Sequence, residues 1–142
     1  MKCVATIPIK KDSERVPGKN FRLINGIPLY QYFLNKMPNC LFDEVYVDTD
    51  SQEIARYAID NGFVHVPRLP ELAGPDANGN DLLNYHVKIL DADCYFQLFI
   101  TSPLLRIDTI NDCIKILKTR NFDSILTTKS IYTWFWFRNL ID

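Results

Sequence analysis

The sequence predicts an α/β fold, a mostly parallel β-sheet flanked by helices. Apolar runs of strand length alternate along the chain with amphipathic segments of helical period. Turn-forming Gly, Pro and Asn residues separate the two kinds of segment. The runs at 3–9 and 94–100 are almost continuously apolar, which is typical of parallel strands buried on both faces. Because strands alternate with helices, we expect a Rossmann-like arrangement.

Each expected element follows from a local pattern. The expected strands are 3–9, 44–49, 63–66, 94–100, 124–128 and 134–137. The expected helices are 28–37, 50–61, 81–90 and 108–117. Pro28 opens the first helix, and Asp50, with Glu53 three residues later, is the expected N-cap of the second. The Asn25-Gly26 pair marks a turn, whereas 67–80 is too long and irregular to be a mere connector.

The bulk composition is that of one globular α/β domain spanning 1–142. The chain has 142 residues, of which 47% are hydrophobic, so a real core is expected. The net charge of −1 gives no support to a broad basic face for nucleic acid. No apolar run approaches the ~20 residues that a membrane span needs. The first strand begins within the first few residues, so we expect no signal peptide ahead of it.

The cysteines and histidines do not predict a disulfide framework or a zinc site. The four cysteines are scattered without a CxxC pair, so reduced thiols and a cytoplasmic location are expected. His65 and His86 also lack the spacing of zinc ligands. We therefore interpret both histidines as structural.

The most informative segment is the basic loop 10–20, which follows the first expected strand. It carries Lys10, Lys11, Arg15 and Lys19, although the chain as a whole is nearly neutral. Ligands bind at the carboxyl ends of the strands in open α/β sheets, and a cationic loop containing a glycine suits a polyphosphate. The alternative is a solvated surface loop. We favour the phosphate hypothesis because the loop is cationic and lies at the ligand edge.

Two common phosphate motifs do not fit this loop. A Walker A loop requires GxxxxGK[ST], and the sequence SERVPGKN at 13–20 differs from it at both ends. The dinucleotide fingerprint GxGxxG is absent from the sequence. Another nucleotide-binding pattern is therefore needed.

Four motifs, in order along the chain, resemble those of the sugar-acid cytidylyltransferases, which include the acylneuraminate (CMP-sialic acid) synthetases. They are SERVPGKN at 13–20, VYVDTDSQEIARYAIDNG at 45–62, RLPELAG at 68–74 and TSPLLR at 101–106. Each motif alone would be a weak signal, but the ordered set is specific. The resemblance implies the nucleotide-diphospho-sugar transferase type of fold, with a nucleotide-binding domain at 1–142.

The resemblance also implies a reaction. CMP would pass from CTP to the anomeric hydroxyl of a nonulosonic-type sugar acid, with release of pyrophosphate and with Mg²⁺ as cofactor. The family form is expected to be a homodimer.

Site roles follow from matching positions and from side-chain chemistry. Lys10, Arg15 and Lys19 would neutralise the triphosphate and the leaving pyrophosphate. The expected substrate-binding residues are Ser13, Asn20, Arg68, Asn78, Asn80 and Arg106. Arg68 matches the position that contacts the nucleotide, with a surface salt bridge as the alternative. Asn78 or Asn80 would read the cytosine edge, and Arg106 would either grip the sugar carboxylate or cap the next segment.

The chain departs from the family pattern in two respects. Phe99-Ile100 stands where the family usually has Gln-Pro, which affects the expected sugar-acid contacts. The sequence also stops at Asp142, before the family's C-terminal part, so we expect an incomplete C-terminus with the Mg²⁺ ligands beyond this chain. The aromatic segment 134–137 would then need a covering partner.

Two other functions stay open from the sequence. Asp48 and Asp50 form a D-x-D triplet after a strand, as in GT-A-like glycosyltransferases that use a metal. Helix capping by Asp50 is the competing explanation. The second alternative is a truncated relative that folds but is not catalytic.

Overall fold

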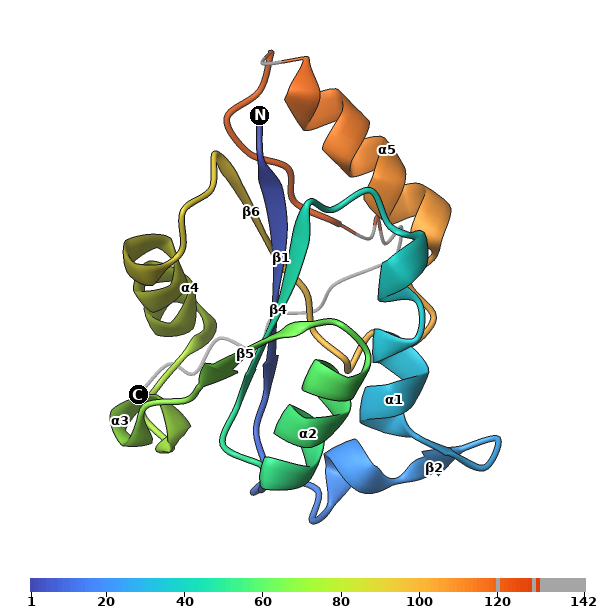
Figure 1. The fold of residues 1–142 in the computed structure, drawn as a ribbon, viewed down its shortest axis with the longest axis vertical. Helices are drawn as coiled ribbons and strands as arrows, with labels where there is room; N and C mark the ends of the chain where they lie inside the picture. The colour runs from blue at the N-terminus through green and yellow to red at the C-terminus, as the bar shows by residue number, and fades with distance from the viewer. Residues whose placement is uncertain (120, 129, 131–142) are drawn as a thin grey trace, which may run out of the picture.

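The computed structural model describes residues 1–119, 121–128 and 130. Its main sheet has four parallel strands, β1 (Cys3–Ile9), β4 (Glu44–Thr49), β5 (Val64–Pro67) and β6 (Cys94–Gln97) (Figure 1). The spatial order is β5-β4-β1-β6, so the chain builds outward from β1 on one side and then returns to its other side. The predicted α/β fold with a parallel sheet is confirmed, and β1 and β6 flank the point where the strand order reverses.

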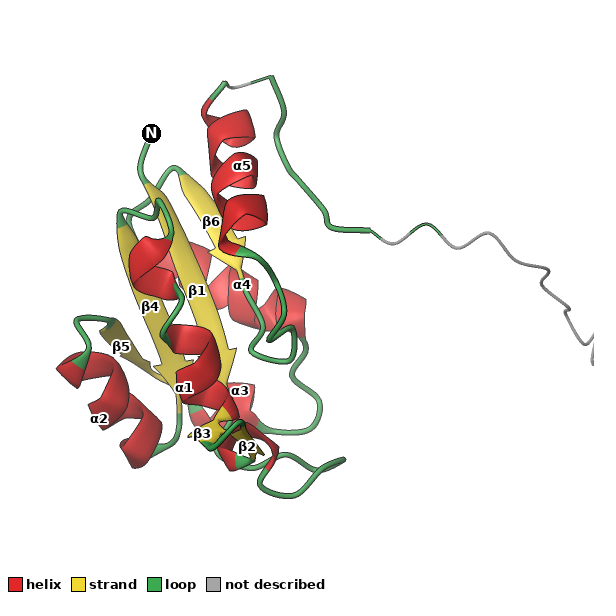
Figure 2. Cartoon of the chain, turned by 90° about the vertical axis from the view of Figure 1, so that its right-hand side faces the viewer, coloured by secondary structure: helices red, strands yellow, loops and turns green. Residues whose placement is uncertain are grey.

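Helices cover both faces of the sheet (Figure 2). One face carries α1 (Leu29–Leu34), α2 (Gln52–Asp60) and α5 (Ile107–Lys118), and the other carries α4 (Gly79–Ile89). The remaining helical elements are the short α3 (Pro70–Ala73) and two 3-10 turns, η1 (Lys19–Phe21) and η2 (Met37–Asn39). Among the described residues, no helix is long and apolar enough to cross a membrane.

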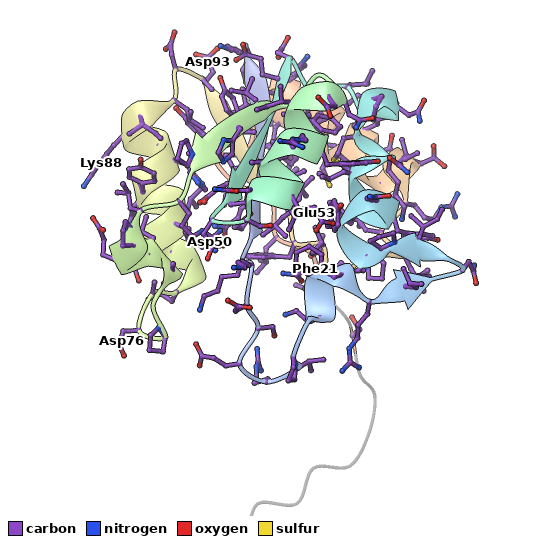
Figure 3. The ribbon with its side chains drawn as sticks, turned by 60° about the horizontal axis from the view of Figure 1, so that its bottom comes forward. Phe21, Asp50, Glu53, Asp76, Lys88 and Asp93 are labelled. Carbon is purple, nitrogen blue, oxygen red and sulfur yellow. The ribbon has the colours of Figure 1, made fainter. Side chains whose placement is uncertain are left out.

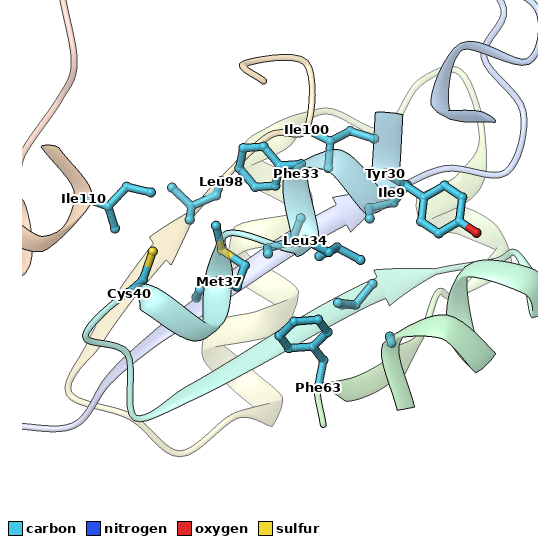
Figure 4. Packing of buried hydrophobic residues seen from close by; sticks show 14 of the residues in the cluster. Ile9, Tyr30, Phe33, Leu34, Met37, Cys40, Phe63, Leu98, Ile100 and Ile110 are labelled. Atoms are coloured by element: carbon cyan, nitrogen blue, oxygen red, sulfur yellow. The ribbon is translucent and has the colours of Figure 1, made fainter. Parts of the chain in front are cut away.

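The main hydrophobic core lies between the sheet and the face formed by α1, α2 and α5 (Figure 4). Alternate residues of β1, including Ile7 and Ile9, point into it, because successive side chains of a strand face opposite ways. Phe33 of α1 and Ile114 of α5 are fully buried against them. Val4, at an alternate position of β1, is also fully buried, which explains the continuous apolar run in the sequence.

The start of α2 corrects one expectation. The N-cap is Ser51, whose hydroxyl accepts a hydrogen bond from the Ile54 amide at 3.4 Å, and not Asp50. The Asp50 carboxylate instead accepts a hydrogen bond from the backbone amide of Lys11 at 2.6 Å. Both residue types cap helices well. Because the Asp50 carboxylate binds the Lys11 amide in the loop after β1, Ser51 caps the helix instead.

The strand β6 is shorter than expected. The sequence predicted a strand to Ile100 buried on both faces, but β6 ends at Gln97 and is only half-buried. The Leu98 amide still bonds to the Thr6 carbonyl at 3.0 Å. The next bond of a parallel ladder would need an N–H from Pro8, which has none. The proline in β1 therefore explains the early end of the pairing.

The expected turn at Asn25-Gly26 is confirmed, whereas an unexpected hairpin and a missing strand are two further differences. The Asn25-Gly26 turn joins a small hairpin, β2 (Leu23–Ile24) and β3 (Ile27–Pro28), in which both turn residues have positive φ, 49° and 80°. The strand expected at 124–128 is wrong, because these residues are irregular and Leu126 is 83% exposed. A strand needs a hydrogen-bonded neighbour, and no described strand pairs with this segment. The strand expected at 134–137 lies outside the described residues.

Candidate functional site

The loop 10–20 leaves β1 at the carboxyl edge of the sheet and borders a cleft of about 490 Å³. Figure 3 shows this loop and the loop that bears Asp76 projecting from the same edge. The residues that line the cleft come from the ends of β1, β5 and β6 and from α4: Pro8, Lys10, Asp12, Ser13, Glu14, Arg15, Lys19, Asn20, Arg68, Pro75, Ala77, Leu82, Phe99, Ile100 and Thr101. The cleft therefore lies where the strand order reverses, the usual ligand position in such sheets.

Local hydrogen bonds fix the shape of the loop. Gly18 has a left-handed φ of 64°, which permits the tight turn into η1. The Lys19 amide donates to the Val16 carbonyl at 3.1 Å. Asn20 is buried, and its side-chain amide donates to the Lys10 carbonyl at 2.5 Å, so it joins the two ends of the loop. Asn20 thus lines the cleft, while its amide nitrogen holds the loop together.

The three cations expected to bind phosphate all line the cleft. Lys10 Nζ lies 3.4 Å from Glu14 Oε1 in its own loop and 3.4 Å from the carbonyl of Gly74, 64 residues further along the chain. Arg15 is exposed and Lys19 is half-buried, so both side chains are accessible to a ligand. Lys11, the fourth cation of the loop, does not belong to the lining residues.

Two acidic residues of the same loop were not assigned a role from the sequence. Asp12 and Glu14 also line the cleft, and Glu14 pairs with Lys10. A signal was available, because both lie between Lys11 and Arg15, within the cationic loop. The ion pair between Lys10 and Glu14 is exposed and therefore weak. A bound triphosphate would compete with Glu14 for Lys10.

Arg68 lines the cleft, and its guanidinium is bound by Asp48, which does not line the cleft. Its Nε lies 2.8 Å from Asp48 Oδ1, and its Nη2 lies 3.1 Å from the Asp48 carbonyl. Both side chains are almost fully buried, at 3% and 1% exposure. The expected alternative, a surface salt bridge, is therefore wrong in one respect: the ion pair exists, but it is buried.

A third residue completes this buried cluster. His86 of α4, which is completely buried, places Nε2 2.8 Å from Asp48 Oδ2. Burial alone raises the pKa of the Asp48 carboxyl, but the hydrogen bonds from His86 and Arg68 outweigh it, and the net pKa is lowered. Asp48 is therefore a carboxylate, and the structural interpretation of His86 agrees with its burial.

The D-x-D triplet does not form a shared acidic site. Both Asp48 carboxylate oxygens are engaged by Arg68 and His86, and Asp50 is engaged by the Lys11 amide. The glycosyltransferase alternative, which needs Asp48 and Asp50 on one metal, therefore finds no support in this geometry. In the described part of the chain, no three His, Cys, Asp or Glu side chains form a group that could hold a metal ion. A Mg²⁺ site supplied wholly by these residues does not fit.

The remaining three predicted residues lie outside the cleft lining. Asn78 is the N-cap of α4, and its Oδ1 accepts from the amides of Asn80 and Asp81 at 2.8 and 3.3 Å. Asn80 is exposed in the first turn of α4. Arg106 occupies the N-cap position of α5, and its Nη2 lies 3.0 Å from Asp108 in an exposed pair. The structure does not bring these side chains together with the basic loop.

The wall of the cleft opposite the basic loop is largely apolar and was missed from the sequence. It includes Pro75, Ala77, Leu82 and Phe99. Phe99, two residues beyond the end of β6, is 43% exposed, so its ring is accessible from the cleft that it lines. Such a wall can cover the face of a flat ring, while the cations opposite it can bind anionic groups. The arrangement therefore suits an amphipathic anion such as a nucleotide.

Comparison with known proteins agrees with this geometry. The family described as cytidylyltransferase matches residues 4–134. The chain is 24% identical to an N-acylneuraminate cytidylyltransferase of Streptococcus agalactiae, covering 92% of this chain and 33% of that protein. It is 31% identical to the CMP-N,N'-diacetyllegionaminic acid synthase of Legionella pneumophila, covering 83% of this chain and 54% of that protein.

A solved structure shows the same fold. The structure of CMP:2-keto-3-deoxy-manno-octonic acid synthetase complexed with CTP superposes with a TM-score of 0.68 at 23% identity. The match covers 84% of this chain and 48% of that one. The chain thus spans from a third to about half of the length of these relatives.

Proposed function

Because the chain belongs to the cytidylyltransferase family, we propose that it binds CTP in the cleft beside the basic loop and takes part in transfer of CMP to a sugar acid. A nonulosonic-type acid is the proposed acceptor, since the matched relatives are named for acylneuraminate and diacetyllegionaminic acid. Mg²⁺ and a homodimer, which the family resemblance implies, are parts of the same proposal, as is the cytoplasmic location expected from the scattered cysteines.

One observation carries this proposal. Lys10, Arg15 and Lys19 border the same cleft, at the point of the parallel sheet where the strand order reverses. A triphosphate carries several negative charges, and cations held in a cleft bind it more strongly than scattered surface charges. The apolar wall that includes Phe99 would cover the cytosine ring.

The proposed reaction needs charge stabilisation more than an enzyme nucleophile. The anomeric hydroxyl oxygen would form a bond to the α-phosphorus as the bond from that phosphorus to the bridging oxygen breaks. The hydroxyl proton leaves to solvent, and the electron pair leaves with pyrophosphate. Lys10, Arg15 and Lys19 would orient the phosphates and stabilise the charge on the leaving group. Bound Mg²⁺ would add neutralisation of phosphate charge, with ligands beyond the described residues.

Titration calorimetry of the 142-residue chain tests the binding step. We expect CTP to bind more tightly than ATP, and Lys19→Ala to weaken CTP binding by about tenfold, because a charge-assisted contact is worth about 1.5–3 kcal/mol. Lys11→Ala is the matched control, since Lys11 belongs to the same loop but does not line the cleft. Equal binding of CTP and ATP would contradict base recognition, and equal effects of the two variants would contradict the assignment of the loop cations.

Turnover is a separate measurement. Release of pyrophosphate from CTP in the presence of a panel of nonulosonic acids would establish the transfer reaction. CTP binding without pyrophosphate release from any acid would instead support the non-catalytic alternative.

A further inference from the structure

We propose that Asp48 and His86 are positioning residues that hold the Arg68 guanidinium in the orientation in which it faces a bound nucleotide. The inference rests on the proposed function, because it takes Arg68 as a nucleotide contact. It assigns a role in this site to a buried carboxylate and a buried histidine that do not themselves line the cleft.

Asp48 holds Arg68 along one edge of its guanidinium. Two of its nitrogens, Nε and Nη2, donate to Asp48, one to the carboxylate and one to the backbone carbonyl. A planar guanidinium bound along one edge by two hydrogen bonds has little freedom to rotate. Nη1 makes no hydrogen bond to any of the described residues, and Arg68 lines the cleft. Nη1 is therefore the guanidinium nitrogen that we propose for the contact with the nucleotide.

A contact from His86 fixes the Asp48 carboxyl group in turn. A carboxylate can only accept, so His86 Nε2 carries the hydrogen and donates to Asp48 Oδ2. This leaves Oδ1 for Arg68 and fixes the rotation of the carboxyl group. His86 Nδ1 has no partner among the described residues, so the contact to Asp48 is the one hydrogen bond of the ring within them. His86 comes from α4, 38 residues beyond Asp48, and so connects α4 to the sheet.

The cluster consists of polar groups although it is buried. Arg68, Asp48 and His86 are all at least nine-tenths buried, and burying charge carries a large desolvation penalty. Apolar side chains of similar volume often give equal or greater stability at such a position. What the polar cluster adds is a fixed orientation for one cation, Arg68, which is one of the residues that line the cleft.

A double-mutant cycle separates positioning from general structural support. CTP affinity is measured by calorimetry for wild type, His86→Leu, Arg68→Ala and the double variant. We expect His86→Leu to weaken CTP binding about fivefold in the wild-type background and to have no further effect once Arg68 is Ala. His86→Gln, which keeps a donor nitrogen, should restore most of the affinity. The control His65→Leu, at the other histidine, should bind CTP as wild type does.

A second variant tests the same claim from Asp48. Asp48→Asn leaves Arg68 buried without a counter-charge and can lower folding stability, so each variant is first checked by circular dichroism. Asp48→Asn combined with Arg68→Ala removes both charges, and it should fold and bind CTP like Arg68→Ala alone. If His86→Leu does not fold, the comparison of this double variant with Arg68→Ala tests the proposal instead.

The outcomes distinguish the two proposals. Failure of the wild-type chain to bind CTP would overturn the proposed function, and this inference with it. Wild-type binding of CTP with unchanged affinity in His86→Leu would overturn the inference alone. The inference would also be overturned if His86→Leu weakened binding equally with and without Arg68, because the histidine would then act through general structure.

Discussion

The two faces of the sheet are filled in different ways. On the face covered by α1, α2 and α5, side chains such as Phe33 and Ile7 form a continuous apolar core. On the face covered by α4, the buried groups include Asp48, Arg68 and His86, joined by directed hydrogen bonds. Apolar burial is strong but non-directional, whereas hydrogen bonds specify orientation. Of these residues, Arg68 lines the cleft, so the polar face is the one connected to the site.

The largest expected effect comes from breaking the apolar face. Phe33 is completely buried, and Phe33→Ala should lower the free energy of unfolding by about 3–5 kcal/mol, because it leaves a cavity in the core. Urea denaturation measures this loss. The folded fraction should bind CTP with wild-type affinity. A large change in affinity for the folded protein would show that the two faces are not separable in function.

The next effect comes from breaking the polar face. Asp48→Asn should lower the free energy of unfolding by about 3 kcal/mol at neutral pH, because it leaves the buried Arg68 without its counter-charge. Urea denaturation again measures the change. A loss as small as that of an exposed pair would contradict the buried assignment of this interaction.

The same carboxyl predicts how stability depends on pH. The pKa of Asp48 is lowered below its ordinary value of 3.8 in the folded protein. Its contribution is therefore fully present above that value and is lost as the pH falls through the lower folded pKa. The free energy of unfolding of wild type should fall more steeply below about pH 4 than that of Asp48→Asn. Glu44, whose pKa is also lowered, is present in both proteins and cancels in the comparison. Parallel profiles would contradict the assignment.

The smallest effect sharpens the contrast between neighbouring residues. Ser51→Ala removes the N-cap of α2 and should cost about 1 kcal/mol of unfolding free energy, with little change in CTP affinity. Asp50→Ala removes the contact to the Lys11 amide and should instead weaken CTP binding, because the basic loop loses an anchor at its base. Thermal unfolding and calorimetry of the two variants should give opposite patterns. The reverse pattern would support the original expectation that Asp50 is the cap.

Local patterns in the sequence were sufficient for most of the fold. The expected strands 3–9 and 44–49 match β1 and β4, because continuous apolar runs and β-branched residues encode buried strands locally. The end of β6 depends on a proline in a different strand, Pro8, and no local pattern contains that information. The choice of Ser51 over Asp50 as the N-cap likewise depends on a distant amide.

The site was predictable to the same extent and for the same reason. Three of the four loop cations line one cleft, and this placement follows from the position of the loop after the first strand. The buried cluster joins Asp48 of β4, Arg68 of the segment that follows β5, and His86 of α4. Asn78 was assigned to the base, but its position before a helix gives its side chain a local partner, as capping preferences would have indicated. The long-range contacts among Asp48, Arg68 and His86, by contrast, can be identified only in the folded structure.

The position of the CTP site can be tested directly by following backbone amide resonances during a CTP titration. We predict that the largest shifts fall on residues 10–20 and on Arg68, at the carboxyl edge of the sheet. Residues at the opposite edge, such as Asp43 and Asp93, should be unaffected. Shifts concentrated at that opposite edge, with the basic loop unchanged, would contradict the account.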